Sequence, residues 1–451
     1  MSRMPRNASI ASLLLVTGCA STAPAPSMWS DPVVSRAVDE VAAERLRDDL
    51  AALVGFGTRH TLSDTSSDTR GIGAARRWLE AQLAATAAAP GVPMQVEMQS
   101  HLIPEGRRMP QPTELVNVVA TIPGSDPDRV IVVSGHYDSR NGNGADATGD
   151  APGANDDGSG TVAVVEAARA IRAALGHRVP RATIRFACVA GEEQGLYGSR
   201  AMAATDREAG HDVFAMLTND IVGGVGGGSG EINRGKVRLF SEGLPSSELA
   251  QKVVGSDNDS TSRQLARYVH ETAATYMPDL HVELVFRQDR YLRGGDHKAF
   301  NEQGFAGVRF TDMYEHFDRQ HQDVRVDDGR SYGDLLEHVD FEVLADVTRL
   351  NVATILSLAL APPSPGNVRV DVSGLSHDTR LLWDDAGSAG VAGYRIRLRP
   401  TSAPVWTAVL DVGNVTEHTL VGVSKDDVLF AVEAYDAEGR TSLPVYPSPG
   451  S

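Results

Sequence analysis

The sequence predicts an α/β protein: a three-layer sandwich around a mixed, mainly parallel central sheet, followed by a small C-terminal all-β sandwich. In the first part of the chain, apolar strand-like runs alternate with helix-like segments. The segment Arg-Val-Ile-Val-Val-Ser at 129–134 contains a continuous apolar run, which is typical of a strand covered on both faces. A Pro- and Gly-rich segment, residues 362–366, marks a linker, and only short strand-like runs follow it.

Apolar residues spaced three or four positions apart predict the helices, as Val34, Ala37, Val38 and Val41 do near the start of the domain. The predicted helices cover residues 33–54, 71–88, 161–174, 197–208, 246–276 and 333–360. The predicted strands of the central sheet cover residues 93–101, 115–122, 130–134, 183–190 and 214–220.

The sequence pattern of residues 366–451 predicts a separate C-terminal domain. Within residues 428–435, core-type side chains recur at every second position, the spacing of a half-buried strand. With Trp383 early and Tyr435 late, this part resembles a fibronectin type III module, which implies a small β-sandwich. Its predicted strands cover residues 368–372, 380–383, 393–399, 406–410, 416–421 and 428–435.

The bulk composition is that of an ordinary globular protein, with 41% hydrophobic and 22% charged residues. A chain of 451 residues is long enough for two or three domains. The formal net charge of −17 argues against nucleic acid as a partner, because binding phosphates needs a basic face.

The N-terminal residues predict export. Arg3 and Arg6 supply a positive start, and residues 10–16 supply a short apolar stretch. This stretch is too short to span a bilayer as a mature helix, so it favours a cleaved signal.

Residues 16–19 (Val-Thr-Gly-Cys) resemble a bacterial lipobox. The resemblance implies a lipoprotein signal peptide over residues 1–18, a lipid on Cys19 and a flexible tether over residues 19–32. The protein would then be anchored to the cell envelope, at the outer membrane or the periplasmic face, unless it is released. That lipid would be its only membrane contact. A secretory signal that happens to contain a cysteine is the alternative. With Cys19 lipidated, Cys188 would stand alone and is expected in the core.

Five short acidic or histidine-bearing segments recur in the middle of the chain. The first four follow, or lie just beyond, a predicted strand, and open α/β sheets bind ligands at strand ends. Imidazole and carboxylate groups together suit zinc, so the segments predict a binuclear zinc site. The segments are His136-Tyr137-Asp138, Asn155-Asp156-Asp157-Gly158, Glu192-Glu193, Asn219-Asp220 and His321-Gln322-Asp323.

Each segment taken alone also has a purely structural explanation. His136 could be a strand-end histidine with one hydrogen bond, and Asp156 could cap the helix that follows it. The consecutive carboxylates of Asp156 and Asp157 repel each other unless a cation lies between them or they face apart. Asp138 could hydrogen-bond the ring nitrogen of His136 that does not bind metal. Taken together, the segments favour metal ligation.

Glu192 and Glu193 directly follow a predicted buried strand, and two glutamates at the edge of a core are costly without charge compensation. Adjacent residues project in different directions, so one could bind metal while the other faces the attacking water as a general base. Further along the chain, these considerations leave a choice between His316 and His321 as a ligand.

The order and context of these segments resemble the co-catalytic di-zinc aminopeptidase family, zinc exopeptidases typified by secreted bacterial leucyl aminopeptidases. The resemblance covers roughly residues 35–361, and we expect a peptidase domain over residues 33–361. It rests on His-Tyr-Asp at 136–138, Gly-Ala-Asn-Asp-Asp-Gly-Ser-Gly at 153–160, Gly-Glu-Glu-Gln-Gly-Leu-Tyr-Gly-Ser at 191–199, Gly-Gly-Asp-His at 294–297 and Gln-His-Gln-Asp at 320–323.

The resemblance also implies a role for each candidate residue. It selects His321 over His316, because His321 is followed by the Gln-Asp pattern. It assigns one zinc ion to His136 and Asp220, the other zinc ion to Glu193 and His321, the bridge between them to Asp156, the general base to Glu192, and the support of His136 to Asp138.

The implied activity is hydrolysis of the N-terminal peptide bond of peptide substrates, with two zinc ions as cofactors. A carboxypeptidase or a dipeptidase-like amidohydrolase on the same site is the alternative, since Arg287, Arg290 or Arg293 could bind a terminal carboxylate of the substrate. A catalytically silent surface-binding protein is a third interpretation, which the complete set of ligands and base disfavours. No oligomeric state follows from the sequence.

Overall fold

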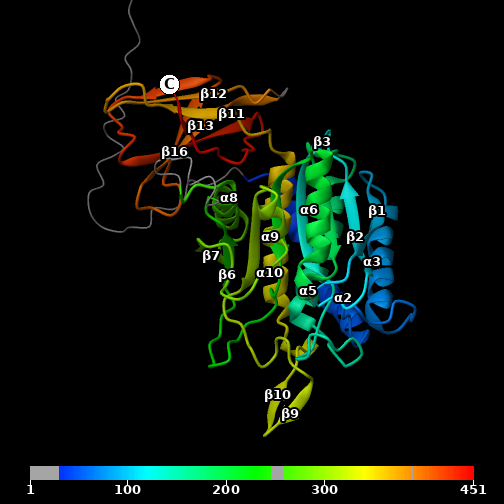
Figure 1. Cartoon of the computed structure of the whole chain (residues 1–451). Helices are drawn as coiled ribbons and strands as arrows, with labels where there is room; N and C mark the ends of the chain where they lie inside the picture. Colours follow the sequence, from blue (N-terminus) through cyan, green and yellow to red (C-terminus); the bar gives the residue numbers. More distant parts are fainter. Residues whose placement is uncertain (1–29, 107, 245–256, 388–389, 451) are drawn as a thin grey trace, which may run out of the picture. The chain divides into compact units, whose positions relative to one another are not determined.

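A mixed eight-stranded sheet forms the centre of the larger of two units of the chain (Figure 1). The computed structural model describes residues 30–106, 108–244, 257–387 and 390–450. The strands are β1 (Gln95–Ile103), β2 (Thr113–Ile122), β3 (Asp126–His136), β4 (Ala182–Val189), β5 (Asp212–Asn219), β6 (Lys236–Ser241), β7 (His281–Val285) and β8 (Gly307–Asp312). Their order in the sheet is β1-β2-β4-β3-β5-β8-β6-β7.

The centre of this sheet is parallel. Strands β4, β3, β5 and β8 are consecutive neighbours, and each pairs in parallel with the next. Strands β6 and β7 are also parallel to each other, whereas β1–β2, β2–β4 and β6–β8 are antiparallel. The predicted α/β class with a mixed, mainly parallel sheet is confirmed. Because the four central strands run the same way, their carboxyl ends share one edge.

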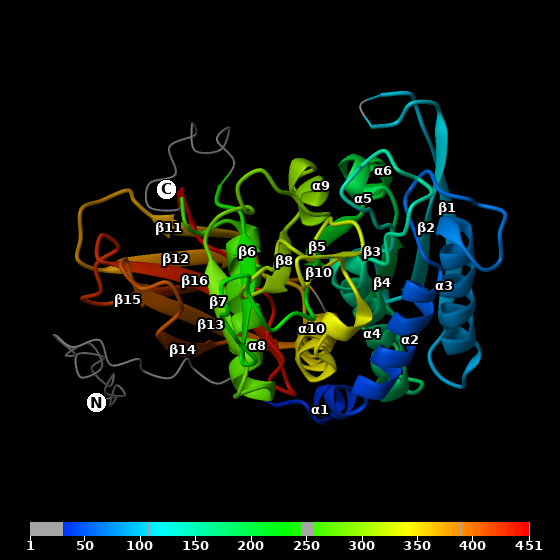
Figure 2. The same cartoon turned by 90° about the horizontal axis from the view of Figure 1, so that it is seen from below.

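Helices cover both faces of the sheet. Helices α6 and α9 pack on one face, and α4 and α10 pack on the other (Figure 2). At the two ends of the sheet, α3 packs on β1 and β2, and α8 packs on β6 and β7 (Figure 2). The helices are α1 (Pro32–Asp39), α2 (Ala43–Gly55), α3 (Gly71–Ala88), α4 (Gly160–Leu175), α5 (Glu192–Gly195), α6 (Tyr197–Ala209), α8 (Thr261–Tyr276), α9 (His297–Glu302) and α10 (Phe341–Leu360).

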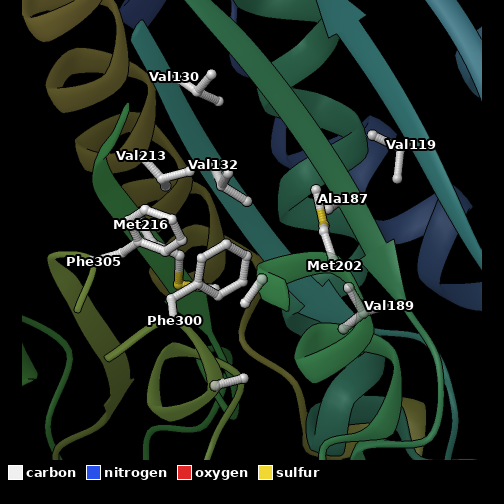
Figure 3. Close-up of a cluster of buried hydrophobic side chains, with 12 residues drawn as sticks. Val119, Val130, Val132, Ala187, Val189, Met202, Val213, Met216, Phe300 and Phe305 are labelled. Carbon is white, nitrogen blue, oxygen red and sulfur yellow. The ribbon is translucent and has the colours of Figure 1, made fainter. Parts of the chain in front are cut away.

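Apolar side chains fill the space between the sheet and helices α6 and α9 (Figure 3). Val130 and Val132 point to this face because alternate residues of a strand share a face. They belong to one cluster with Met202 of α6 and Phe300 of α9, and Phe300 is completely buried. Helix α9 is short, so this ring is its main anchor to the core.

Replacing Phe300 with alanine should lower the free energy of unfolding by about 3–5 kcal/mol, because the change removes a large buried side chain and leaves a cavity. Phe317→Ala is the matched control, since the ring of Phe317 is 63% exposed. We expect its free energy of unfolding to change by about 0.5 kcal/mol or less. Urea denaturation of both variants measures the difference, and equal midpoints would contradict a core role for Phe300.

Three predicted helices differ from the observed ones. The single helix predicted over 33–54 is two helices, because the chain turns between α1 and α2, where the backbone N–H of Ala42 donates to buried Glu166 (2.9 Å). The helix predicted over 333–360 begins only at Phe341, where Asp340 caps it. Of the helix predicted over 246–276, the structure shows α8, and residues 245–256 lie outside the described residues.

One described helix, α10, is long and apolar enough to cross a membrane by length and composition alone. However, 89% of its apolar window is buried inside the protein, where the helix packs against α1 and α4. Helix α10 is therefore a core helix of the larger unit.

The C-terminal residues 362–451 belong to the second unit, and the predicted all-β character is confirmed. Their strands are β11 (Gly366–Asp371), β12 (Thr379–Asp384), β13 (Val391–Pro400), β14 (Ala408–Gly413), β15 (Glu417–Leu420), β16 (Val428–Asp436) and β17 (Ser448–Gly450). They form two sheets, β15-β12-β11-β17 and β14-β13-β16. A core that includes Trp383 and Tyr394 joins the sheets, with ring centroids 5.6 Å apart. The fibronectin type III assignment stays a prediction.

The signal peptide, residues 1–18, and Cys19 lie outside the described residues, as does most of the tether over 19–32. The lipid on Cys19 and the location in the cell envelope therefore stay predictions. Cys188 is a buried residue of β4, as expected of a small core side chain.

Candidate metal centre

The carboxyl edge of the four parallel strands carries the residues singled out in the sequence. His136 is the last residue of β3, and Asp220 directly follows β5. Glu192 and Glu193 open α5, just beyond β4. Asp156 lies in the helical turn Ala154–Ser159 ahead of α4, and His321 lies in the loop after β8. Shared strand direction thus brings together side chains from distant parts of the chain.

Five of these residues form two adjoining donor groups. His136, Asp156 and Asp220 make up the first, and Asp156, Glu193 and His321 make up the second. Within each group, the potential ligand atoms all lie within 4.8 Å of one another. The Asp156 carboxylate belongs to both groups. Its Oδ1 lies 3.3 Å from His136 Nε2, and its Oδ2 lies 2.9 Å from His321 Nε2, so each oxygen faces a different histidine.

The His136 ring fits a zinc ligand. Its Nδ1 lies 3.1 Å from the carbonyl oxygen of Asp138, whereas its Nε2 is buried and has no hydrogen-bond partner among the described residues. That Nε2 faces carboxylate oxygens of Asp156, Glu192 (3.9 Å) and Asp220 (3.9 Å). In a metal-binding imidazole, one ring nitrogen is hydrogen-bonded to the protein and the other faces the metal position, as in His136. The chemistry of both donor groups, imidazole with carboxylate, also suits zinc.

Asp138 connects His136 to the start of α5. Its carboxylate accepts hydrogen bonds from Thr61 Oγ1 (3.0 Å) and from the backbone N–H groups of Glu193 (3.1 Å) and Glu192 (3.3 Å). Burial pushes the pKa of Asp138 upward, but His136 and these donors outweigh burial and hold the pKa below its usual value. The Asp138 carboxylate therefore holds the backbone of the two glutamates, while its backbone carbonyl contacts the His136 ring and its Oδ1 lies 3.5 Å from His136 Nδ1.

The consecutive aspartates face apart. Asp157 accepts hydrogen bonds from the backbone N–H groups of His136 (2.9 Å), Gly160 (2.9 Å) and Ile221 (3.3 Å), so it caps α4 and ties together two strand ends. Asp156 turns toward the donor groups, and Gln320 Nε2 donates to its Oδ2 (2.9 Å). The capping role considered for Asp156 therefore belongs to its neighbour.

The two glutamates also diverge. Glu193 is part of the second donor group, and its Oε1 lies 2.9 Å from His321 Nε2. Glu192 belongs to neither group, and its Oε2 lies beside His136 Nε2. Burial raises the pKa of Glu192 well above its usual value, although His136 opposes this shift. A carboxylate with a raised pKa beside a metal position is a candidate proton acceptor.

The other histidines lie elsewhere. His316 does not belong to either donor group, and its Nδ1 lies 4.0 Å from Asp318. The Nε2 of buried His297 contacts the carbonyl oxygen of Gln288 (2.9 Å), and burial lowers the pKa of His297 to about 4.

Several residues around the centre were not assigned a role from the sequence. Arg309 is buried in β8 and forms an ion pair with Asp220 (2.9 Å) and another with Asp289 (3.0 Å). Asp296 is buried, and burial raises its pKa to about 6. The Gly-Gly-Asp-His pattern at 294–297 was the available signal for Asp296, but a buried arginine in a strand has no sequence signal of its own.

The buried Arg59 side chain connects two segments that contain candidate metal ligands. Its Nε donates to the carbonyl oxygen of Tyr137 (2.7 Å), and its NH2 group donates to that of Gly153 (2.8 Å). Burial lowers the pKa of Arg59 to about 10, while nearby carboxylates, led by Asp334, oppose the shift. Arg59 thereby fixes Tyr137, which follows β3, relative to Gly153, which precedes Asp156.

The fold and the two donor groups define an α/β protein with a zinc centre suited to hydrolysis. Comparisons with known proteins agree with this class. A probable zinc metalloprotease of Leptosphaeria maculans is 45% identical to this chain over 419 residues, which are 92% of this chain and 96% of the relative. A probable zinc metalloprotease of Pyricularia oryzae is 45% identical over 432 residues, 93% and 85% of the two chains. Residues 117–339 match the model of peptidase family M28. The chain belongs to this family, which confirms the predicted kinship with zinc exopeptidases.

Solved structures show the same fold. The LapA aminopeptidase of Legionella pneumophila superposes with a TM-score of 0.53 and 22% identity, covering 72% of this chain and 74% of that one. LapB of the same organism superposes with a TM-score of 0.53 and 20% identity, covering 75% and 78%. Both matches support the α/β architecture described above.

Proposed function

We propose that this zinc metallopeptidase is an aminopeptidase that uses two zinc ions and removes the N-terminal residue of peptides. The observation that carries the proposal is the shared Asp156 carboxylate, which joins the two donor groups into one binuclear centre beside Glu192. His136 and Asp220 would hold one ion, and Glu193 and His321 would hold the other.

When bound, the two ions would lower the pKa of a water molecule and polarise the substrate carbonyl group. Glu192 accepts the proton of the attacking water and then donates it to the leaving amine. Burial raises the pKa of Glu192, which favours proton acceptance from the water. Asp138 keeps His136 in the required orientation throughout.

The preference for N-terminal peptide bonds draws on the structural neighbour named as an aminopeptidase. The alternative of a catalytically silent surface-binding protein is disfavoured, because both donor groups are complete and Glu192 lies beside them.

The test is a panel of aminoacyl amides assayed beside N-acetylated peptides of the same residues. We expect hydrolysis only where the N-terminus is free, because an exopeptidase of this kind must recognise the terminal amino group. Mass spectrometry of the products identifies the bond that is cut. Release of C-terminal residues from the N-acetylated peptides would instead support the carboxypeptidase alternative and contradict this proposal.

A further inference from the structure

Three arginine side chains surround the second donor group. Arg140 Nε donates to Glu193 Oε2 (2.8 Å), and Arg108 NH1 donates to the backbone carbonyl oxygen of Glu193 (3.0 Å). Arg140 NH2 and Arg293 NH1 lie 2.7 and 3.1 Å from the Nδ1 of His321. Two guanidinium groups that reach the same nitrogen atom must lie side by side.

Other arginines close to the centre are neutralised by carboxylates. Arg290 forms ion pairs with Asp289 and Glu315, and Arg309 forms ion pairs with Asp220 and Asp289. In contrast, within the described part of the chain Arg293 forms no ion pair with a carboxylate, and its hydrogen-bond contacts are with His321 and Gln320.

The two arginines differ in their compensation by carboxylates. Within the described residues Arg140 pairs with Glu193, whereas Arg293 pairs with no carboxylate. When Glu193 holds a metal ion, its charge would be shared between that ion and Arg140. Two adjacent guanidinium groups repel each other unless an anion lies close to both. A planar guanidinium fork matches the paired oxygens of carboxylate and phosphate groups, and of these a peptide supplies the carboxylate.

We infer that Arg140 and Arg293 bind a carboxylate group of the substrate next to Glu193 and His321. This inference rests on the proposed function and narrows its substrate class to peptides with a negative charge near the scissile bond. That carboxylate is either the free C-terminus of a dipeptide or an aspartate or glutamate side chain. A lysine or arginine side chain at the same place would be disfavoured by repulsion.

Three substrate pairs, each differing only in a carboxylate and its amide, distinguish the sources of the charge. Leucyl-leucine and leucyl-leucinamide test the terminal carboxylate. Leucyl-glutamic acid α-amide and leucyl-glutaminamide test the second side chain, and aspartyl-leucinamide and asparaginyl-leucinamide test the first. In at least one pair we expect kcat/KM to favour the carboxylate by about 10- to 100-fold, the range of charge-assisted hydrogen bonds.

Arg293→Gln should reduce this ratio toward one, and Arg293→Lys should leave an intermediate ratio, because lysine keeps the charge but loses the fork. Arg287→Gln is the matched control on the same loop, since the Arg287 guanidinium lies over the exposed Tyr291 ring (4.1 Å), and it should keep the wild-type ratio. Thermal melting verifies that each variant is folded. Calorimetric titration of Glu192→Gln protein, with and without Arg293→Gln, should show the same preference in Kd.

Equal kcat/KM within all three pairs, or a preference that Arg293→Gln leaves intact, would overturn the inference while leaving the proposed function in place. Failure of the wild-type enzyme to cleave any of the six peptides would instead refute the proposed function. The two failures are therefore distinguishable in one data set.

Discussion

Replacing Glu192 with glutamine should lower kcat by about 10²- to 10⁴-fold while the bound zinc stays unchanged. The substitution keeps the size of the side chain and removes its ability to accept a proton. Because Glu192 belongs to neither donor group, the residues that would hold metal remain intact. Steady-state kinetics on an aminoacyl amide measure the rate, and elemental analysis measures zinc per chain.

Glu302→Gln is the matched control for this variant. Glu302 pairs with Arg200 on the surface and its side chain is 45% exposed, so we expect near wild-type kinetics. Full activity of Glu192→Gln would remove Glu192 from the role of general base. A large loss of zinc in that variant would show that the side chain is a ligand instead.

Replacing Asp156 with asparagine should lower the zinc bound per chain more than the replacement of any other single ligand, because the Asp156 carboxylate belongs to both donor groups. We expect zinc per chain to fall by more than in Asp220→Asn, where only one group is affected. Loss of the metal ions removes several kcal/mol of transition-state stabilisation, so kcat/KM should fall by about 10³-fold or more. Metal analysis of dialysed protein, together with kinetics, tests both statements.

Asp150→Asn is the control in the same region, since that side chain is 67% exposed and pairs with Arg70. It should keep the zinc content and activity of the wild type. Treatment of the wild type with a chelator should abolish hydrolysis, and added zinc should restore it. Activity that survives complete removal of metal would contradict the metal assignment.

Three of the four central strands were predictable, but β8 and the two strands beyond it in the sheet were not. Strands β3, β4 and β5 carry long apolar runs, whereas β8 carries Arg309 and Thr311 among its fully buried residues. A buried arginine has the sequence signature of a surface residue. It can be buried here because Asp220 and Asp289 pair with it, and neither pairing is visible from local sequence. Strands β6, β7 and β8 therefore have no counterpart among the predicted elements.

The helix boundary between α1 and α2 was not predicted for the same reason, since it involves a partner far away along the chain. The periodic apolar spacing over residues 33–54 continues across the turn between α1 and α2. Helix α1 ends at Asp39, and α2 begins after Ala42, whose backbone N–H donates to Glu166, 124 residues away along the chain. Local periodicity contains no information about such a partner.

For the candidate centre, the sequence showed imidazole and carboxylate side chains in five segments, four of which follow predicted strands. The resemblance to a known family then indicated the class of enzyme and selected His321 over His316. The folded structure was needed to show that Asp156 joins two donor groups while Asp157 binds backbone amides, and that Arg140 and Arg293 meet beside His321. These relations depend on how parallel strands align their ends in space, and spacing along the chain does not encode them.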